Sequence, residues 1–216
     1  LNGGEITQIN VREGDTVKSG QVLVVLNKVR EQAGVGEARG KVAAFLSQKV
    51  RIDAELFEKP LQFPEMLTDY PDFVRNQTQL YERRRFALRT ELSKLQEMKT
   101  LLVEELNLNL PLLEQGDVAR SEIIRMQRTI VDVEKQMSSI EQKYVQDLQA
   151  ELVRTEEELV SAEQILAQRQ DALDATVLVA PTNGIVKNVR LTTVGGVLRP
   201  GDEVLQIVRT GDKLVV

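Results

Sequence analysis

The sequence of 216 residues contains no cysteine, no histidine and no tryptophan, and only 4% of its residues are aromatic. Without cysteine and histidine, thiol catalysis, imidazole catalysis, disulfide bonds and the usual zinc ligands are excluded. No apolar run approaches the ~20 residues that a membrane-spanning helix needs, and the net charge of −5 gives no bias towards nucleic acid. The sequence also lacks a Walker loop and a dinucleotide-binding fingerprint. We predict a protein that is not an enzyme and that uses no cofactor, metal ion or nucleic acid.

Both ends of the chain have the short apolar spacings and the Gly-Asp or Pro-Gly turns of β structure, in residues 4–26 and 179–208. The two segments align with Gly4 on Gly184 if one extra residue is allowed in the second. Each is too short to bury an apolar face alone, because two or three strands are marginal in water. We therefore expect the two halves to pair into one β module, with glycines at its structural turns. These glycines are Gly14, Gly20, Gly184, Gly195 and Gly201.

The roughly 150 residues between the two halves are rich in Leu, Glu, Gln, Arg and Ala, the composition of long helices or coiled coil. The spacing of their apolar residues predicts a first helix over 29–59 and a helical hairpin over 72–176, with its tip near 107–121. Prolines make 60–71 a bend. The predicted fold class is α+β: a split β module with an inserted long antiparallel coiled-coil hairpin.

Three residues set the expected ends of the hairpin helices. Asp72 is the predicted N-cap of the second helix, Gly116 the residue just past its end, and Asp117 the cap of the third. The third helix is longer than its antiparallel partner. The first helix should therefore overlap the base of the second and form a short three-helix section near the β module.

Several charged residues have both a functional and an ordinary interpretation. Lys28 lies near the junction of the two β halves, where biotin- and lipoyl-carrying domains have a lysine, but it lacks the tight turn that modifying enzymes recognise. The arginines at 83–85 and the glutamates at 156–158 are consecutive, so they fan around a helix instead of converging on a ligand. An ordinary solvated surface is the favoured interpretation of all three features.

The hairpin tip is different, because Leu110, Leu112, Leu113 and Val118 are apolar at a site that should be exposed. Exposed apolar residues at such a place indicate contact with a partner. The alternative is that they only close the turn, since a hydrophobic contact often accompanies a helix end.

The motifs of the two β halves resemble those of HlyD-type membrane fusion proteins, also called periplasmic adaptor proteins, of Gram-negative bacteria. Residues 179–186 (VAPTNGIV) and 195–202 (GGVLRPGD) are similar to the family's closing half, "APxxGxV … GxxVxxG". Residues 14–23 (GDTVKSGQVL) are similar to its opening half, "EGxxVxxGxxL". The resemblance covers the whole chain, because a split lipoyl-like module with an inserted α-hairpin is the signature of the family.

This resemblance implies lipoyl-like halves in residues 1–28 and 177–210, which carry no lipoate, and a following β-barrel domain that begins in residues 211–216. It implies a periplasmic location, with an inner-membrane anchor in an N-terminal segment that the sequence does not include. It also implies that the protein links an inner-membrane transporter to a TolC-like outer-membrane channel, and that copies of it form a ring, typically of six.

Two branches of the family differ at the tip. Drug-efflux adaptors carry an Arg, a Leu four residues on and a Ser seven further, whereas here the three positions hold Leu108, Leu112 and Ala119. This departure, with the extra helix before Pro60, favours type I secretion, in which an ABC transporter exports a polypeptide. A multidrug-efflux adaptor is the alternative, and a biotin or lipoyl carrier domain is a third. On the secretion interpretation the outer-membrane channel docks on Leu112, Leu113, Gly116, Asp117, Val118 and Arg120.

Overall fold

The computed structural model describes residues 3–190, 193–199 and 201–209. The chain divides into two compact units, of which the first comprises Leu1–Val42 with Val160–Val216, and the second comprises Ala43–Leu159. The first unit holds the β structure and the second holds the hairpin tip. The expected start of a further domain at 211–216 lies outside the described residues.

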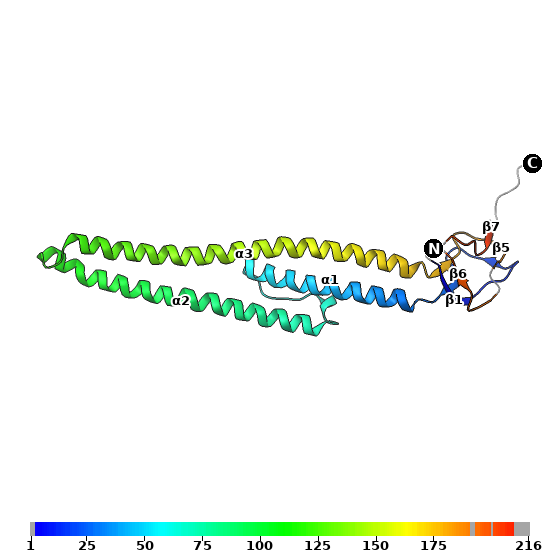
Figure 1. The fold of residues 1–216 in the computed structure, drawn as a ribbon, viewed down its shortest axis with the longest axis horizontal. Helices are drawn as coiled ribbons and strands as arrows, with labels where there is room; N and C mark the ends of the chain where they lie inside the picture. The colour runs from blue at the N-terminus through cyan, green and yellow to red at the C-terminus, as the bar shows by residue number, and fades with distance from the viewer. Residues whose placement is uncertain (1–2, 191–192, 200, 210–216) are drawn as a thin grey trace, which may run out of the picture. The chain divides into compact units, whose positions relative to one another are not determined.

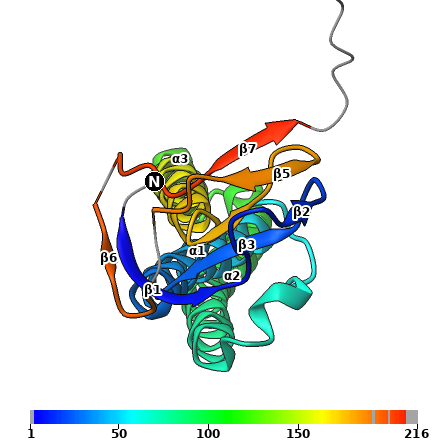
Figure 2. The same ribbon diagram turned by 90° about the vertical axis from the view of Figure 1, so that its right-hand side faces the viewer.

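The β module of the first unit consists of two sheets, and each takes strands from both ends of the chain (Figure 2). The four-stranded sheet has the order β4-β3-β1-β6 and the three-stranded sheet the order β2-β5-β7. The split module expected from the sequence is therefore present. The strands are β1 (Gly4–Ile9), β2 (Thr16–Val17), β3 (Val22–Leu26), β4 (Val177–Val179), β5 (Gly184–Lys187), β6 (Val197–Leu198) and β7 (Gln206–Arg209).

The strand pairing repeats between the two halves. Gly4 of β1 lies opposite Leu198 of β6, and Gly184 of β5 lies opposite Val17 of β2, so the same alignment positions meet twice. Both of these pairings are between the halves, not within one of them. One shared core results, in which the buried residues of the two halves are Ile6, Val11, Val17, Leu23, Val24, Leu26, Ala180, Val186, Leu198 and Val204.

The glycines assigned to the module serve two different purposes. Gly14, Gly20, Gly195 and Gly201 have φ angles between 82° and 91°, in the left-handed region that side chains disfavour. Gly184 instead lies inside strand β5 and is buried. A Cβ atom there would stand 2.5 Å from both Ile207 Cγ2 and the carbonyl oxygen of Val208. Gly184 therefore allows the β5 and β7 backbones to approach each other, which is a packing role and not a turn.

Replacing Gly184 with alanine should destabilise the β module by about 1–3 kcal/mol, because the new methyl group meets the Val208 carbonyl of the β7 backbone as well as the Ile207 side chain, and the backbone cannot move aside. Calorimetric melting of the purified protein would measure the change. Gly36→Ala is the matched control, since a Cβ atom at this helical position meets nothing within 4 Å. That variant should be neutral or stabilising by up to ~1 kcal/mol. Equal melting temperatures for the two variants would contradict the close approach.

Four helical segments lie between the β halves, and their bounds follow the sequence pattern with small shifts (Figure 1). Asp72 is not the N-cap of α2: the helix begins at Pro71, and the residue before it is Tyr70, which makes no side-chain cap. Proline suits this first helical position because its missing N–H would have no partner there. Asp72 instead pairs with Arg75. The segments are α1 (Val29–Leu56), the short 3₁₀ helix η1 (Glu65–Leu67), α2 (Pro71–Gln115) and α3 (Arg120–Asp174).

The C-terminal part of α1, residues 43–56, belongs to the second unit and lies alongside both long helices there. None of these residues is exposed. Arg51, whose side chain is 1% exposed, donates a hydrogen bond of 2.8 Å to Gln77 of α2 and another to Glu151 of α3. The first helix therefore overlaps the second, and three helices pack together at this level.

A cluster of charged groups forms the centre of the three-helix section. Arg51 Nη1 lies 2.6 Å from Glu55 Oε1, and Arg84 of α2 reaches Glu151 at 2.8 Å. Burial and the hydrogen bond to Glu55 raise the pKa of Tyr144, so its hydroxyl stays protonated and donates to that carboxylate. Burial opposes ionisation of Glu151, but Arg84 and Arg51 together lower the pKa of its carboxyl. The charges are thus mutually satisfied inside the bundle.

Removing Arg51 should cost the second unit about 3–5 kcal/mol, because Arg51→Ala leaves the buried Glu55 carboxylate without its nearest cation. Urea unfolding followed by circular dichroism at the helix wavelength would measure the loss. Arg75→Ala is the control: the Arg75–Asp72 pair is 64% and 74% exposed, so its removal should cost about 1 kcal/mol or less. If both variants unfold at the same urea concentration, the cluster does not stabilise the bundle.

Candidate docking tip of the helical hairpin

The tip between α2 and α3 is closed by a defined helix-ending motif. Gly116 has φ 85° and follows the last residue of α2. Its N–H donates to the carbonyl of Leu113 at 3.1 Å, and the N–H of Asp117 donates to the carbonyl of Leu112 at 2.9 Å. This pair of bonds is a Schellman motif, which satisfies carbonyls that a helix end leaves without partners. The chain reverses direction here because glycine accepts the left-handed angle.

The start of α3 differs from the prediction. The helix begins at Arg120, and the N–H of Glu122 donates to the carbonyl of Ala119 at 2.9 Å. Ala119 is therefore the residue before the helix, and Asp117 is not its cap. The Schellman bond fixes Asp117 within the turn itself, two residues too early to cap α3. Its carboxylate lies on an exposed residue of the tip.

The apolar residues of the tip fall into two groups. Leu113 and Val118 are half-buried, which suits the closing of the turn. Leu108, Leu110 and Leu112 are exposed by 68%, 41% and 37%. Turn closure does not require these three leucines, because their side chains face water in the isolated chain. The exposed set is the part of the tip that can contact a partner.

Pro111 lies inside α2, one turn before its end. Proline has no N–H, so the carbonyl of Asn107, four residues earlier, loses its usual helical partner. Asn109 bonds to its own helix instead of crossing the hairpin: its side-chain amide donates to the Glu105 carbonyl at 2.8 Å. By contrast, Lys99 crosses to α3 and pairs with Glu134 at 2.8 Å. Lys99 thus makes a polar contact between α2 and α3, whereas the hydrogen bond of the Asn109 side chain stays within α2.

The other charged features have the following surroundings. Lys28 is exposed, and its carbonyl accepts a hydrogen bond from Gln32, so it directly precedes α1 and does not lie in a tight turn. In the arginine triplet, Arg83 and Arg85 are exposed, as a solvated face requires. Arg84 is different, because it turns into the buried charged cluster. The sequence could have indicated this burial, because Arg84 lies four residues before the apolar Leu88 and so on the same face of α2.

Neither a metal site nor a membrane span is found in the described part of the chain. No three residues of the metal-binding types His, Cys, Asp and Glu gather within residues 3–190, 193–199 and 201–209. Across the same ranges, no helix combines the length and the apolar content needed to cross a bilayer.

A split β module with an inserted helical hairpin is the architecture of the soluble domains of membrane fusion proteins, and the comparisons with known proteins agree. The chain resembles the soluble domain of LipC, a membrane fusion protein of a type I secretion system, with a TM-score of 0.71 and 25% identity over 97% of each chain. It also shares the fold of the periplasmic adaptor protein EmrA, with a TM-score of 0.52 and 21% identity over 96% of this chain and 69% of that one.

Sequence comparison leads to the same group. Over its whole length the chain is 22% identical to PrsE, a type I secretion system membrane fusion protein of Rhizobium meliloti, and covers 60% of it. Over 99% of its length it is 23% identical to the alkaline protease secretion protein AprE of Pseudomonas aeruginosa, and covers 61% of it. No protein-family model matches the chain. The resemblance to membrane fusion proteins of type I secretion that the sequence indicated is confirmed, and the chain spans about three fifths of these curated relatives.

The Schellman turn predicts a ranking of substitutions at Gly116. Gly116→Asn should destabilise the tip less than Gly116→Ala, because asparagine tolerates the left-handed angle, and alanine should cost about 1 kcal/mol. Hydrogen exchange of the amides at 112–118 would measure the local opening. The same exchange rates in the alanine variant and the parent protein would show that the turn does not depend on this angle.

Proposed function

We propose that the chain belongs to a periplasmic adaptor of type I secretion. It links an inner-membrane ABC exporter to a TolC-like outer-membrane channel for one-step export of a polypeptide. The exposed leucines of the tip, Leu108, Leu110 and Leu112, are the observation that carries this proposal. They are supported by the likeness to LipC over nearly the whole chain.

The docking surface in this proposal is the tip. Leu112 would enter an apolar pocket on the channel, while Leu113 and Val118 hold the turn that presents it. Gly116 and Asp117 supply the two backbone bonds of the turn, and Arg120 adds an exposed cation beside it. A rigid, pre-formed turn favours docking because little conformational entropy is lost on contact.

Assembly with other copies of the chain is the second part of the proposal. Over its 45 residues, α2 contains no buried residue, so the seam with α3 leaves apolar surface accessible. Outside the seam, Ile124, Val131 and Val145 repeat on α3 at multiples of seven residues and are 40%, 47% and 41% exposed. Such a row supports side-by-side packing of hairpins. A repeated head-to-tail contact forms a ring when the rotation between copies closes, and we propose a ring of six copies.

The proposed location is the periplasm, with anchoring to the inner membrane by a segment outside this sequence. A multidrug-efflux adaptor is the alternative function. The likeness to EmrA concerns the fold, whereas both curated relatives and LipC are secretion proteins by name. The carrier interpretation has less support, because Lys28 directly precedes a helix and not a hairpin turn.

Replacing the tip leucine at position 112 with aspartate should abolish export while leaving the helices folded. An exposed leucine contributes little to stability, but a carboxylate cannot enter an apolar pocket without losing its hydration. The measurement is the amount of substrate polypeptide in the culture medium of a strain that carries the variant as its only copy. Circular dichroism of the purified variant would verify the fold.

Leu101→Asp is the matched control, since Leu101 is a 61% exposed leucine of the same helix outside the tip. It should export at the parental level. Normal export by the Leu112→Asp variant would remove the docking assignment. If the adaptor instead serves drug efflux, deleting it should leave polypeptide export unchanged and raise sensitivity to small toxic compounds.

A further inference from the structure

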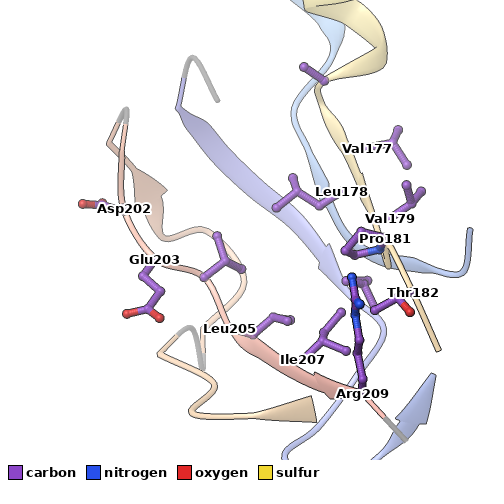
Figure 3. Close-up of a pocket in the computed structure, with 13 residues that line it drawn as sticks. Val177, Leu178, Val179, Pro181, Thr182, Asp202, Glu203, Leu205, Ile207 and Arg209 are labelled. Carbon is purple, nitrogen blue, oxygen red and sulfur yellow. The ribbon is translucent and has the colours of Figure 1, made fainter. Parts of the chain in front are cut away.

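Buried charge distinguishes the second unit from the first. Among the residues that the structure describes, Arg51 and Glu55 are the only charged residues that are buried. The first unit has an apolar pocket of about 650 Å³ in its β module, and Figure 3 shows the charged residues among those that line it. All of these are exposed, namely Asp202, Glu203 and Arg209. A change of protonation should therefore alter the packing of the helices and not that of the β module, because burial is what makes a change of charge costly.

The carboxylates of Glu55 and Glu151 join the C-terminal part of α1 to both long helices. Glu55 of α1 accepts a hydrogen bond from Tyr144 of α3, and the guanidinium group of Arg84 of α2 lies 3.5 Å from the same oxygen. Glu151 of α3 binds the guanidinium groups of Arg51 and Arg84. Arginine keeps its charge in proteins. In acid, therefore, only the two carboxyls of this cluster can change their charge.

This part of α1, residues 43–56, has few large apolar anchors. Six of its residues are buried, and only one of them, Ile52, has a large apolar side chain. The others are small or charged: Ala43, Ser47, Ala54, Arg51 and Glu55. Alanine and serine bury little apolar area, so the segment depends strongly on the charged cluster for its attachment.

The segment covers a strip of α3 that is formed by Leu148 and Thr155. These residues follow Glu141 at intervals of seven, so all three lie on one side of α3. Glu55, in the last turn of α1, contacts Tyr144, so α1 ends between the levels of Leu148 and Glu141. Leu148 and Thr155 are 0% and 5% exposed, whereas Glu141, beyond the end of α1, is exposed. Burial on this side of α3 thus stops where α1 stops.

We propose that residues 43–56 of α1 form an acid-sensitive segment: protonation of Glu55 and Glu151 releases it from α2 and α3, while these two helices stay paired. Once both carboxyls are neutral, the charges of Arg51 and Arg84 lie close together without a counter-ion. Arg51 is 1% exposed, so its charge cannot be hydrated in place. An unpaired buried charge beside a like charge is far less stable than a charge in water, and the segment can hydrate it only by leaving. The proposal does not depend on the secretion function.

The part of the hairpin beyond α1 lacks this dependence on buried charge. An ion pair between α2 and α3 there, Lys99 with Glu134, is 31% and 48% exposed. Water can replace a lost partner at such a place, so the pair contributes little. The buried residues of α3 beyond the end of α1, Ile123 and Val133, are apolar. Acid should therefore uncover the α3 strip before it separates α2 from α3.

The pH range follows from the pKa of Glu151. Burial raises this pKa, but Arg84 and Arg51 together lower it further than burial raises it. A carboxyl with a lowered pKa stabilises the folded state at every pH above its ordinary value of about 4.3, and this stabilisation is lost as the pH falls through the lowered value. Release is therefore expected below about pH 4. Tyr144 has no corresponding effect in alkali, because burial and Glu55 raise the pKa of its hydroxyl.

The other elements near the cluster add little to this dependence. On α1, Lys49 lies 2.8 Å from Asp53 and 3.1 Å from Glu156 of α3, and all three side chains are partly exposed. This contact contributes less than the buried cluster because water screens it. The connector at 57–70 forms no ion pair with the cluster among the described residues.

Thiol accessibility tests the proposal, since the chain has no cysteine of its own. Thr155→Cys places a thiol under the segment, and Val133→Cys is the matched control between α2 and α3; the two parent residues are 5% and 3% exposed. The reagent is a dipyridyl disulfide, which reacts with thiols in acid, and each rate is compared with that of the same variant unfolded in urea at the same pH. Below about pH 4 this protection should fall at least about tenfold for the Thr155→Cys variant and stay unchanged for the Val133→Cys variant.

Two further variants, each made in both thiol backgrounds, separate the cluster from acid effects elsewhere. Glu151→Gln removes one carboxylate from the cluster, and Glu134→Gln removes the carboxylate that pairs with Lys99. The first should raise the pH of release by about one unit or more, because less negative charge opposes the two arginines, and the second should leave it unchanged. The proposal is overturned if the Thr155→Cys thiol stays protected down to about pH 3. It is also overturned if both thiols lose protection together in any of these proteins, or if the two glutamine variants behave alike.

Discussion

The hydrogen bond from the N–H of Leu26 to the carbonyl of Thr176, 2.8 Å long, joins the point where the chain leaves the β module to the point where it returns. α1 begins three residues after Leu26, and α3 ends two residues before Thr176. The residues between Leu26 and Thr176 must therefore leave the β module and return to it. Closing so long a loop costs only slightly more than closing a short one, because the entropy grows with the logarithm of its length. The shared core of the two halves can offset that cost.

Within the second unit, the packing of α1 depends on charge as much as on apolar contact. Arg51, Glu55 and Glu151 form a chain of contacts that continues to Arg84 of α2. Shifting α1 by one helical turn would leave buried ions unpaired, which costs more than losing a few apolar contacts. We attribute to this cluster a role in setting the register of three helices. A purely leucine-based seam would specify that register less strictly.

The sequence was most informative where a pattern repeats. The alignment of Gly4 with Gly184 predicted a shared β module, and the apolar spacing predicted the helices to within a few residues. It was least informative for single charged residues. Arg51 and Glu55 each directly precede an apolar residue of the helix, Ile52 and Leu56, so by spacing alone they are expected on a solvated face. Their burial depends on a second and a third helix, which no local pattern encodes.

At the hairpin tip, too, the sequence could predict one feature and not another. Gly116 was predictable, because a glycine after a long apolar pattern is a strong signal for a helix end. The cap of α3 was not, since Asp117 is chemically a better cap than Ala119. Asp117 supplies its backbone N–H to the Schellman motif, and that bond fixes its position before α3 can begin. The capping preference of Asp117 is therefore outweighed by the closure of α2, which gives two carbonyl groups a hydrogen-bond donor.

The second unit, taken by itself, leaves apolar surface that a self-sufficient domain would cover. In the 45 residues of α2, all of them described, no residue is buried. A half-buried contact between two helices reduces the stability of an isolated chain, because apolar area stays in water. The same surfaces gain free energy when further polypeptide covers them. For the adaptor that we propose, stability is then coupled to assembly: a chain that was fully closed alone would have little to gain from its partners.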